Sequence, residues 1–232
     1  MMNYFNTLLF GIYPFVALTV FLVGSLIRYD RDQYTWRTGS SQLLEKKKLR
    51  LGSYLFHVGI IAILAGHFVG LLTPKAVWHL LGVEASTKQA LAMIAGGLFG
   101  VICFVGMTIL IHRRLTNPRV RATSSTMDIT ILLLLYVQLI LGLLSIFVSA
   151  GHMDGAVMLQ LMTWAQSIVT FNASDAVAAI SDVNVIYKLH IFLGMTLFLL
   201  FPFSRLVHVW SLPVQYLGRN YQVVRARGAR RV

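Results

Sequence analysis

Apolar residues gather into five long runs that are separated by polar and charged segments. Each run is long enough to cross a bilayer as a helix, which takes about 20 mostly apolar residues. The runs cover residues 4–27, 51–73, 90–111, 128–149 and 184–207. This pattern predicts an all-α membrane protein with five transmembrane helices.

A sixth apolar stretch lies within residues 150–182. Its core, AVMLQLMTWAQSIVTF, is interrupted by Gln160, Thr163, Gln166 and Ser167. A further crossing would also carry the arginine-rich C-terminus to the opposite side of the membrane. We therefore expect an amphipathic helix that lies in the outer membrane interface, with Trp164 as its anchor.

The composition agrees with a membrane protein. Of the 232 residues, 57% are hydrophobic and only 12% are charged, about half the charged fraction of an ordinary soluble domain. The formal net charge is +12, but its distribution argues against nucleic-acid binding. Of the 20 lysine and arginine residues, 17 lie in one set of connections or at the C-terminal end, and the others are Lys75, Lys88 and Lys188. This asymmetry predicts an external N-terminus and a cytoplasmic C-terminus.

The lone cysteine, Cys103, lies inside the third run, so no disulfide can form within the chain. No C-x-x-C-H sequence is present for covalent haem attachment. Any haem would therefore be held by ligation and packing alone, as in b-type cytochromes. The chain is hydrophobic from its start, without a basic region or a cleavage site, which favours a retained first helix.

Four histidines lie within the apolar runs or at their ends, where an imidazole is costly. His57 and His67 belong to the second run, and His190 and His208 to the last. The two helices should run antiparallel, so His57 lies level with His208 near the cytoplasm and His67 with His190 near the outside. A neutral imidazole on each face of a haem iron fills both axial positions. The pattern predicts two stacked bis-histidine haems that transfer electrons.

The spacing within the two runs differs. Ten residues separate His57 from His67, roughly 15 Å along a helix, and eighteen separate His190 from His208, roughly 27 Å on one face. Either the ligand axes tilt in opposite senses or the last helix bends, for which Pro202 is placed suitably. The average predicts irons roughly 20 Å apart and haems rotated relative to each other.

Other polar and small residues have simpler interpretations. A single histidine in a membrane helix is about as often hydrogen-bonded to a neighbouring helix as bound to a metal. His79, His112 and His152 lie at or beyond the ends of runs, where a solvated interfacial histidine is expected. The third run contains glycines that would let helices or a flat cofactor approach closely. They are Gly96, Gly97, Gly100 and Gly106.

Several sequence runs closely resemble the gamma subunit of membrane-bound respiratory nitrate reductase. They are RYDRDQYTWR, FHVGIIAILAGHFVGLLTP, RRLTNPRVRAT, GHMDG, WAQSIVTF, KLHIFLGMTLFLLFPFSRLVHVWSLPVQYL and YQVVRAR. The resemblance spans essentially the whole chain. It implies a five-helix di-haem cytochrome b of a prokaryotic inner membrane, which oxidises menaquinol or ubiquinol. Electrons would pass to an iron–sulfur beta subunit and then to a molybdenum-containing alpha subunit, which reduces nitrate to nitrite.

The resemblance also assigns residues. The family's haem ligands fall on His57 and His208 for the cytoplasmic-side haem, and on His67 and His190 for the outer haem. The quinol site falls on Gly66, His67 and Lys88. Lys88 is suited to hydrogen-bond a quinone oxygen; the alternative is a lysine at a helix start that simply extends to water. Three arginines could pair with haem propionates or serve only topology: Arg28, Arg114 and Arg205.

Residues 1–208 are thus expected to form the di-haem domain, and the tail 209–232 to dock on the partner subunits. No paired carboxylate, activated nucleophile or phosphate loop is present, so nitrate is not reduced on this chain. One alternative is a related di-haem subunit of a sulfur-metabolism or disulfide-reductase complex. Others are an ion transporter with a histidine relay and a structural anchor without haem.

Overall fold

The computed structural model describes residues 2–36, 41, 44–211 and 218, and these form helices without a strand. Five helices are long: α2 (Tyr13–Arg31), α3 (Lys46–Leu72), α5 (Ala85–Thr116), α7 (Thr126–Ala150) and α10 (Val185–Leu200). Short α-helices are α1 (Met2–Asn6), α4 (Lys75–Leu80), α6 (Pro118–Ala122), α8 (Ala156–Val169) and α9 (Ala173–Ile180). The remaining turns are π-helical in η1 (Thr7–Ile12) and 3₁₀ in η2 (Gln33–Thr35), η3 (Phe201–Phe203) and η4 (Arg205–Ser211).

The five predicted transmembrane helices are confirmed among the described residues. Segments long and apolar enough to cross a membrane are Tyr4–Arg31, Lys46–Leu72, Ala85–Thr116, Thr126–Ala150 and Val185–Phe203. They extend past the apolar runs at the basic ends, where Lys46 begins α3 and the last turn of α5 holds Arg113 and Arg114. Cations can therefore belong to a spanning helix while lying beyond the apolar core of the membrane.

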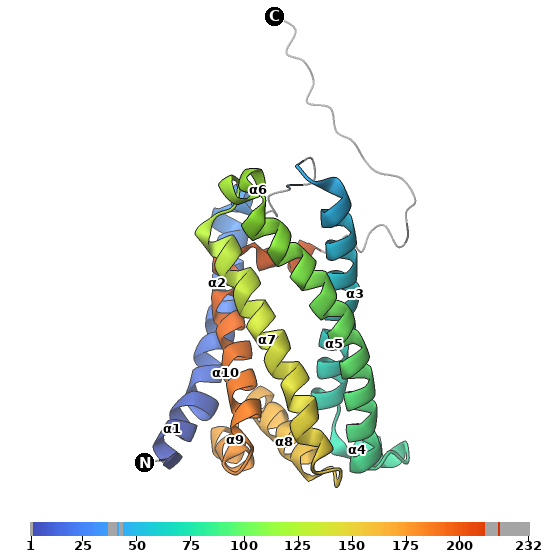
Figure 1. Ribbon diagram of the computed structural model, residues 1–232. Helices are drawn as coiled ribbons and strands as arrows, with labels where there is room; N and C mark the ends of the chain where they lie inside the picture. Colours follow the sequence, from blue (N-terminus) through green and yellow to red (C-terminus); the bar gives the residue numbers. More distant parts are fainter. Residues whose placement is uncertain (1, 37–40, 42–43, 212–217, 219–232) are drawn as a thin grey trace, which may run out of the picture.

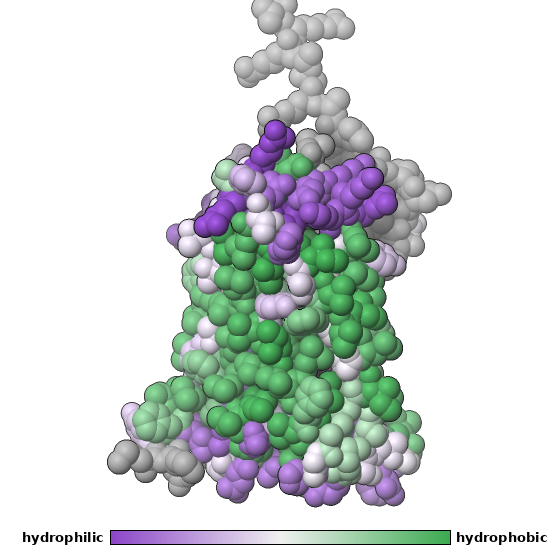
Figure 2. Space-filling model, viewed as in Figure 1, coloured by the Kyte–Doolittle hydropathy of each residue, from purple (hydrophilic) through white to green (hydrophobic). Residues whose placement is uncertain are grey.

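The helices form a bundle in which α3 packs on α5, α5 on α7, α7 on α10 and α10 on α2 (Figure 1). The N-terminus, α4, α8 and α9 lie at one end, and α6 lies at the other. Figure 2 shows a broad hydrophobic belt between two hydrophilic ends. Large apolar side chains such as Phe68, Ile94 and Phe147 are 69–77% exposed. Such an apolar exterior requires lipid around it.

Glycines set the close packing of α3 on α5. A methyl group added at Gly59 would lie 2.6 Å from Cys103 Cβ, and one at Gly106 would collide with the backbone nitrogen of Phe56. A methyl at Gly100 would lie 2.6 Å from Leu143 on α7. The prediction of close approach is therefore confirmed for Gly100 and Gly106. At Gly96 no described helix approaches, because an added methyl group would have no neighbour within 4 Å.

Residues 150–182 do not supply a sixth span. They form α8 and α9, and the 14 residues of α8 cover only about 21 Å. The prediction that Trp164 anchors this segment at the membrane surface is wrong. Trp164 is only 6% exposed, and its indole N–H donates to the carbonyl oxygen of Phe10 (3.1 Å). The reason is tertiary packing, because α8 contacts α3, α5 and α9 and turns its apolar face to protein.

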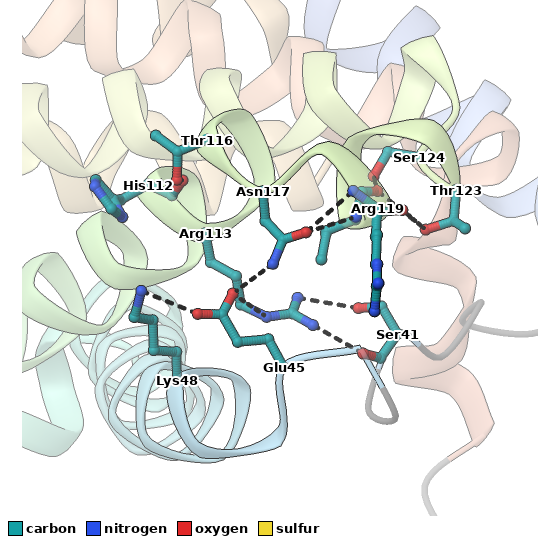
Figure 3. Close-up of polar contacts among 11 residues, drawn as sticks. Ser41, Glu45, Lys48, His112, Arg113, Thr116, Asn117, Arg119, Thr123 and Ser124 are labelled. Atoms are coloured by element: carbon teal, nitrogen blue, oxygen red, sulfur yellow. Dashed lines mark hydrogen bonds and ion pairs between the residues drawn. The ribbon is translucent and has the colours of Figure 1, made fainter.

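A polar cluster fixes the connection before α3 to the end of α5 (Figure 3). Buried Arg113 donates to the carbonyl and hydroxyl oxygens of Ser41 (2.8 and 3.0 Å) and lies 3.8 Å from the Glu45 carboxylate. Glu45 also accepts from Lys48 (2.9 Å) and Asn117 (3.1 Å). Hydrogen bonding from Lys48 lowers the pKa of the Glu45 carboxyl. Arg113 therefore serves packing here and not only membrane topology.

The last span ends earlier than predicted. Regular helix stops at Leu200, and the chain continues through η3 and η4. Pro202 lacks a backbone N–H and cannot continue the helical hydrogen bonds. Arg28 on α2 donates to the carbonyl oxygens of Pro202 (2.6 Å) and Ser204 (2.9 Å), which fixes the new chain direction. Most of the predicted tail, 212–217 and 219–232, lies outside the described residues.

Candidate functional site

The four intramembrane histidines form two facing pairs. The imidazole centres of His57 and His208 are 6.3 Å apart, and those of His67 and His190 are 6.0 Å apart. The two rings are inclined by 70° in the first pair and by 34° in the second. The first pair, here called the inner pair, lies towards the α6 end of the bundle; the second, the outer pair, lies towards α4 and α8. The structure thus brings together the same partners as the sequence analysis.

His208 reaches His57 by an unexpected route. It lies in the 3₁₀ segment η4 and not on α10, so the expectation of one straight helical face carrying His190 and His208 is wrong. The alternative, a bend at Pro202, is confirmed by the helix end at Leu200. Because His208 lies beyond the end of α10, the eighteen residues from His190 to His208 need not span the roughly 27 Å of a continuous helix. Their separation therefore no longer conflicts with the ten-residue separation of His57 and His67.

Each of the four imidazoles has Nδ1 close to a backbone carbonyl oxygen. His57 Nδ1 bonds Ser53 O (2.7 Å), and His67 Nδ1 bonds Ile63 O (2.8 Å). His208 Nδ1 bonds Arg205 O (2.7 Å), and His190 Nδ1 bonds Gln138 O (3.1 Å). A carbonyl oxygen only accepts, so each Nδ1 must carry the proton. The lone pair then lies on Nε2, the nitrogen through which each imidazole can bind a metal ion.

The separation of the rings suits one metal ion in each pair. An imidazole nitrogen lies about 2 Å from a bound first-row metal and roughly 1.2 Å from its own ring centre, which puts the centres of two opposed ligands about 6.4 Å apart. The observed 6.3 and 6.0 Å are close to this value. Within the described part of the chain, no three His, Cys, Asp or Glu side chains converge to hold a metal ion. Two imidazoles alone suit a metal whose other ligands come from a porphyrin.

Lys88 lies near the outer pair and is buried, with 5% of its surface exposed. Its Nζ donates to the carbonyl oxygen of Gly70 (2.5 Å), contacts Met162 Sδ and lies 4.5 Å from the ring centre of Trp78. The alternative of a lysine extending to water is therefore wrong, because α4 and α8 cover this side chain. Gly70 is three residues after His67 on α3.

Small residues leave space on the same part of α3. An added methyl group at Gly66 or at Gly70 would meet no heavy atom within 4 Å. Trp78 carries a buried indole N–H for which the described residues supply no hydrogen-bond acceptor. Sequence reasoning named Gly66 but missed Trp78, Met162 and Gly70. A tryptophan between two predicted spans was the available signal for Trp78, whereas Met162 has no such signal.

The other polar candidates differ in their surroundings. Arg28 donates hydrogen bonds to backbone carbonyl oxygens of η3 and the residue that follows it. The guanidinium groups of Arg114 and Arg205 instead lie 3.9 and 3.7 Å from the Asp128 carboxylate. Their possible role towards haem propionates stays a prediction. The three histidines at the ends of runs are exposed, as expected: His79, His112 and His152.

Comparison with known proteins identifies the family. The family model of the nitrate reductase gamma subunit matches residues 6–227. The chain belongs to the nitrate reductase gamma subunit family. It is 54% identical over 226 residues to the respiratory nitrate reductase 1 gamma chain of Escherichia coli (strain K12), which covers 97% of this chain and 100% of that relative. The respiratory nitrate reductase 2 gamma chain of the same organism is 49% identical over 229 residues, 98% and 100% of the two chains.

A more distant member of the gamma subunit family has the same extent. The nitrate reductase gamma chain of Bacillus subtilis (strain 168) is 40% identical over 220 residues, 95% of this chain and 98% of the relative. Together with the five apolar helices, family membership establishes a multi-pass inner-membrane subunit of an oxidoreductase complex. The resemblance inferred from the sequence runs is confirmed.

Proposed function

We propose that this gamma subunit binds two haem b groups and conducts electrons from quinol to its partner subunits. His57 and His208 would hold one haem, and His67 and His190 the other. The observation that carries the proposal is the pairing of four imidazoles at metal-ligand separation, each with its Nδ1 proton donated to a carbonyl. When bound, haem would supply a reversible one-electron carrier.

The distribution of basic residues supports one orientation in the membrane. At the α6 end lie Lys46, Lys47, Lys48, Arg113, Arg119 and Arg121, and Figure 2 shows a hydrophilic surface there. Basic residues mark the cytoplasmic side of a membrane protein. We infer that the inner pair faces the cytoplasm, where the basic connections and the tail 209–232 dock on an iron–sulfur beta subunit. A molybdenum-containing alpha subunit would then receive the electrons and reduce nitrate to nitrite.

We place the quinol site beside the outer pair, at Lys88, Gly66 and His67. Lys88 is a buried cation next to the unpaired indole N–H of Trp78, so both can donate to a quinol oxygen. Gly66 and Gly70 leave the adjoining face of α3 open to a flat ring. Menaquinol or ubiquinol would lose its protons to the outside while electrons leave at the inner end. This separation of charge would contribute to proton-motive force.

The propionates of the inner haem have candidate partners in addition to Arg114 and Arg205. An open pocket of about 420 Å³ beside His57 is lined by Lys46, Arg50 and Tyr54. Its two cations are suited to carboxylate groups.

Haem counting tests the proposal. The pyridine haemochrome content and the reduced-minus-oxidised spectrum are measured for the complex with the wild-type chain and with single His57→Ala, His67→Ala, His190→Ala and His208→Ala changes. We expect two haems per wild-type chain and one fewer in each variant. His152→Ala, at an exposed position, is the matched control. A colourless wild-type protein would favour a histidine-relay transporter or a bare anchor and refute the proposal.

A further inference from the structure

A glutamine lies in the middle of the most apolar spanning helix. Gln138 belongs to α7, in the run LLLLYVQLILGLL, and is partly buried. A primary amide inside a membrane helix is costly unless it is hydrogen-bonded, and it commonly marks a functional position. Its contacts show which residue it serves.

Among the described residues, the hydrogen bonds of Gln138 across the helix interface all go to His190. The backbone carbonyl of Gln138 accepts the Nδ1 proton of His190 (3.1 Å). Its side-chain Nε2 donates to the backbone carbonyl of His190 (3.0 Å) and lies 3.3 Å from the ring Nε2. Because Nδ1 carries the proton, ring Nε2 is an acceptor and the amide donates to it. One residue therefore contacts both ring nitrogens and the backbone of the same histidine.

The other three histidines are oriented differently. His57, His67 and His208 each donate Nδ1 to a carbonyl three or four residues earlier in the chain. His190 instead depends on a carbonyl of another helix. Its ring orientation is therefore fixed by the packing of α7 on α10.

Two glycines bring these helices close enough for the contact. A methyl group at Gly142, one turn after Gln138, would lie 3.1 Å from Cε1 of His190. A methyl at Gly194, one turn after His190, would lie 3.2 Å from the amide nitrogen of Gln138. Each large polar side chain thus faces a glycine of the antiparallel helix. The Gln138 amide oxygen is buried without a hydrogen-bond partner among the described residues. Burying an unpaired acceptor is energetically unfavourable, so this position calls for an explanation.

We propose that Gln138 is the positioning residue for His190, the ligand of the outer haem. It would hold the Nδ1–H tautomer, which leaves the lone pair on Nε2 for the iron, and it would restrict rotation of the ring. The inference rests on the proposed haem ligation. An iron bound at Nε2 would take the lone pair that the amide contacts here, whereas the two bonds to backbone carbonyls would persist. Gln138 would therefore orient His190 before the iron binds and would keep it oriented afterwards.

The test uses the whole complex carrying Gln138→Leu or Gln138→Met, both of which remove the amide. Haem content, the midpoint potential of each haem and the low-spin EPR signals are measured. We expect an altered potential and EPR signal for the outer haem alone, and its preferential loss during detergent washing. The inner haem is an internal control. Thr196→Val is the matched variant, since it removes a hydrogen bond from α10 to Tyr13 on α2 instead.

An outer-haem signal and potential identical to wild type in both variants would overturn the inference. Equal changes at both haems would also overturn it, since they would show a general loss of packing. If neither variant accumulates, Gly194→Ala gives the same readout by displacing the amide, and an unchanged outer signal there is decisive against the inference. A wild-type complex without haem would refute the proposed function itself, which is a separate outcome.

Discussion

The inner and outer histidine pairs have the same composition but different supports. In the outer pair both histidines lie on regular helices, and α7 orients His190. In the inner pair, His208 lies in η4, after the chain has left α10. Of the inner pair, only His57 lies on a long helix, so η4 must be held in place by contacts with its neighbours.

Those local contacts come from α2 and the connection that follows it. Arg28 bonds the carbonyls of Pro202 and Ser204, and Trp36 donates to the Ser211 hydroxyl (2.6 Å). Trp210 stacks on Phe21 with ring centres 5.4 Å apart. The outer site therefore depends on helix packing inside the membrane, whereas the inner site depends on the short segment η4 and the contacts that hold it. Perturbations should therefore separate the two sites unless they act on α3 itself.

The largest effect is expected for Gly106→Leu. Its side chain would collide with the backbone of α3 at Phe56 and move the helix that carries both His57 and His67. Overpacking of a well-packed site typically costs about 1–3 kcal/mol, and more where backbone must move, as here. We expect loss of both haems and a lower midpoint of thermal denaturation in detergent. Gly96→Ala, where an added methyl has no neighbour within 4 Å, is the control and should resemble wild type. Selective loss of one haem in Gly106→Leu would contradict a shared role of α3.

A change at Arg28 should affect the inner site alone. Arg28→Ala removes two charge-assisted hydrogen bonds to Pro202 and Ser204, which together contribute on the order of 3–6 kcal/mol to local stability, and also the bonds of Arg28 to Thr35. We expect loss or weakened retention of the inner haem, measured as haem content with one EPR signal preserved. Arg31→Ala, an exposed cation one turn later, is the matched control. An intact inner signal in Arg28→Ala would show that η4 holds its course without these bonds.

The sequence carries the features that depend on length, depth and residue type. Five apolar runs predict five spans, and the depth of the histidines predicts their pairing. What depends on tertiary contacts is absent from such patterns. Pro202 indicated where the last helix could bend, but the sequence did not show that His208 would lie beyond the end of that helix. Trp164 resembled an interfacial anchor because nothing in its own segment shows that α8 is covered by other helices.

The polar groups of the site show the same limit. Lys88 was identified, but its burial depends on Trp78 and Met162 from two other helices. The sequence analysis did not single out Gln138. Its partner could not be found from spacing, because His190 is 52 residues away and the contact depends on glycines of both helices.

A smaller effect, confined to the outer site, is expected for Gly142→Ala. Alanine in place of glycine stabilises a helix by about 0.5–1 kcal/mol, so the denaturation midpoint should not fall greatly. The new methyl would nevertheless press on Cε1 of His190 at 3.1 Å and rotate the ring. We expect a changed EPR signal of the outer haem with an unchanged inner signal. Gly97→Ala, whose nearest neighbour would be at 3.7 Å, is the control. Equal shifts at both haems would mean that the two sites are coupled through α7.

The smallest effect is expected at the polar cluster around Glu45, which lies at the inner end but contacts neither pair. The pKa of Glu45 is lowered in the folded protein, mainly by the Lys48 hydrogen bond. Its ionised form therefore adds stability above the ordinary value near 4.5, and this contribution is lost as the pH falls through the lowered pKa. Glu45→Gln should be slightly less stable than wild type at pH 7, and the difference should vanish in acid. Thermal denaturation as a function of pH measures this, and added salt should reduce it because the carboxylate is partly exposed. Haem content should not change, since Arg113 retains its bonds to Ser41; loss of the inner haem would instead show that this cluster supports His57.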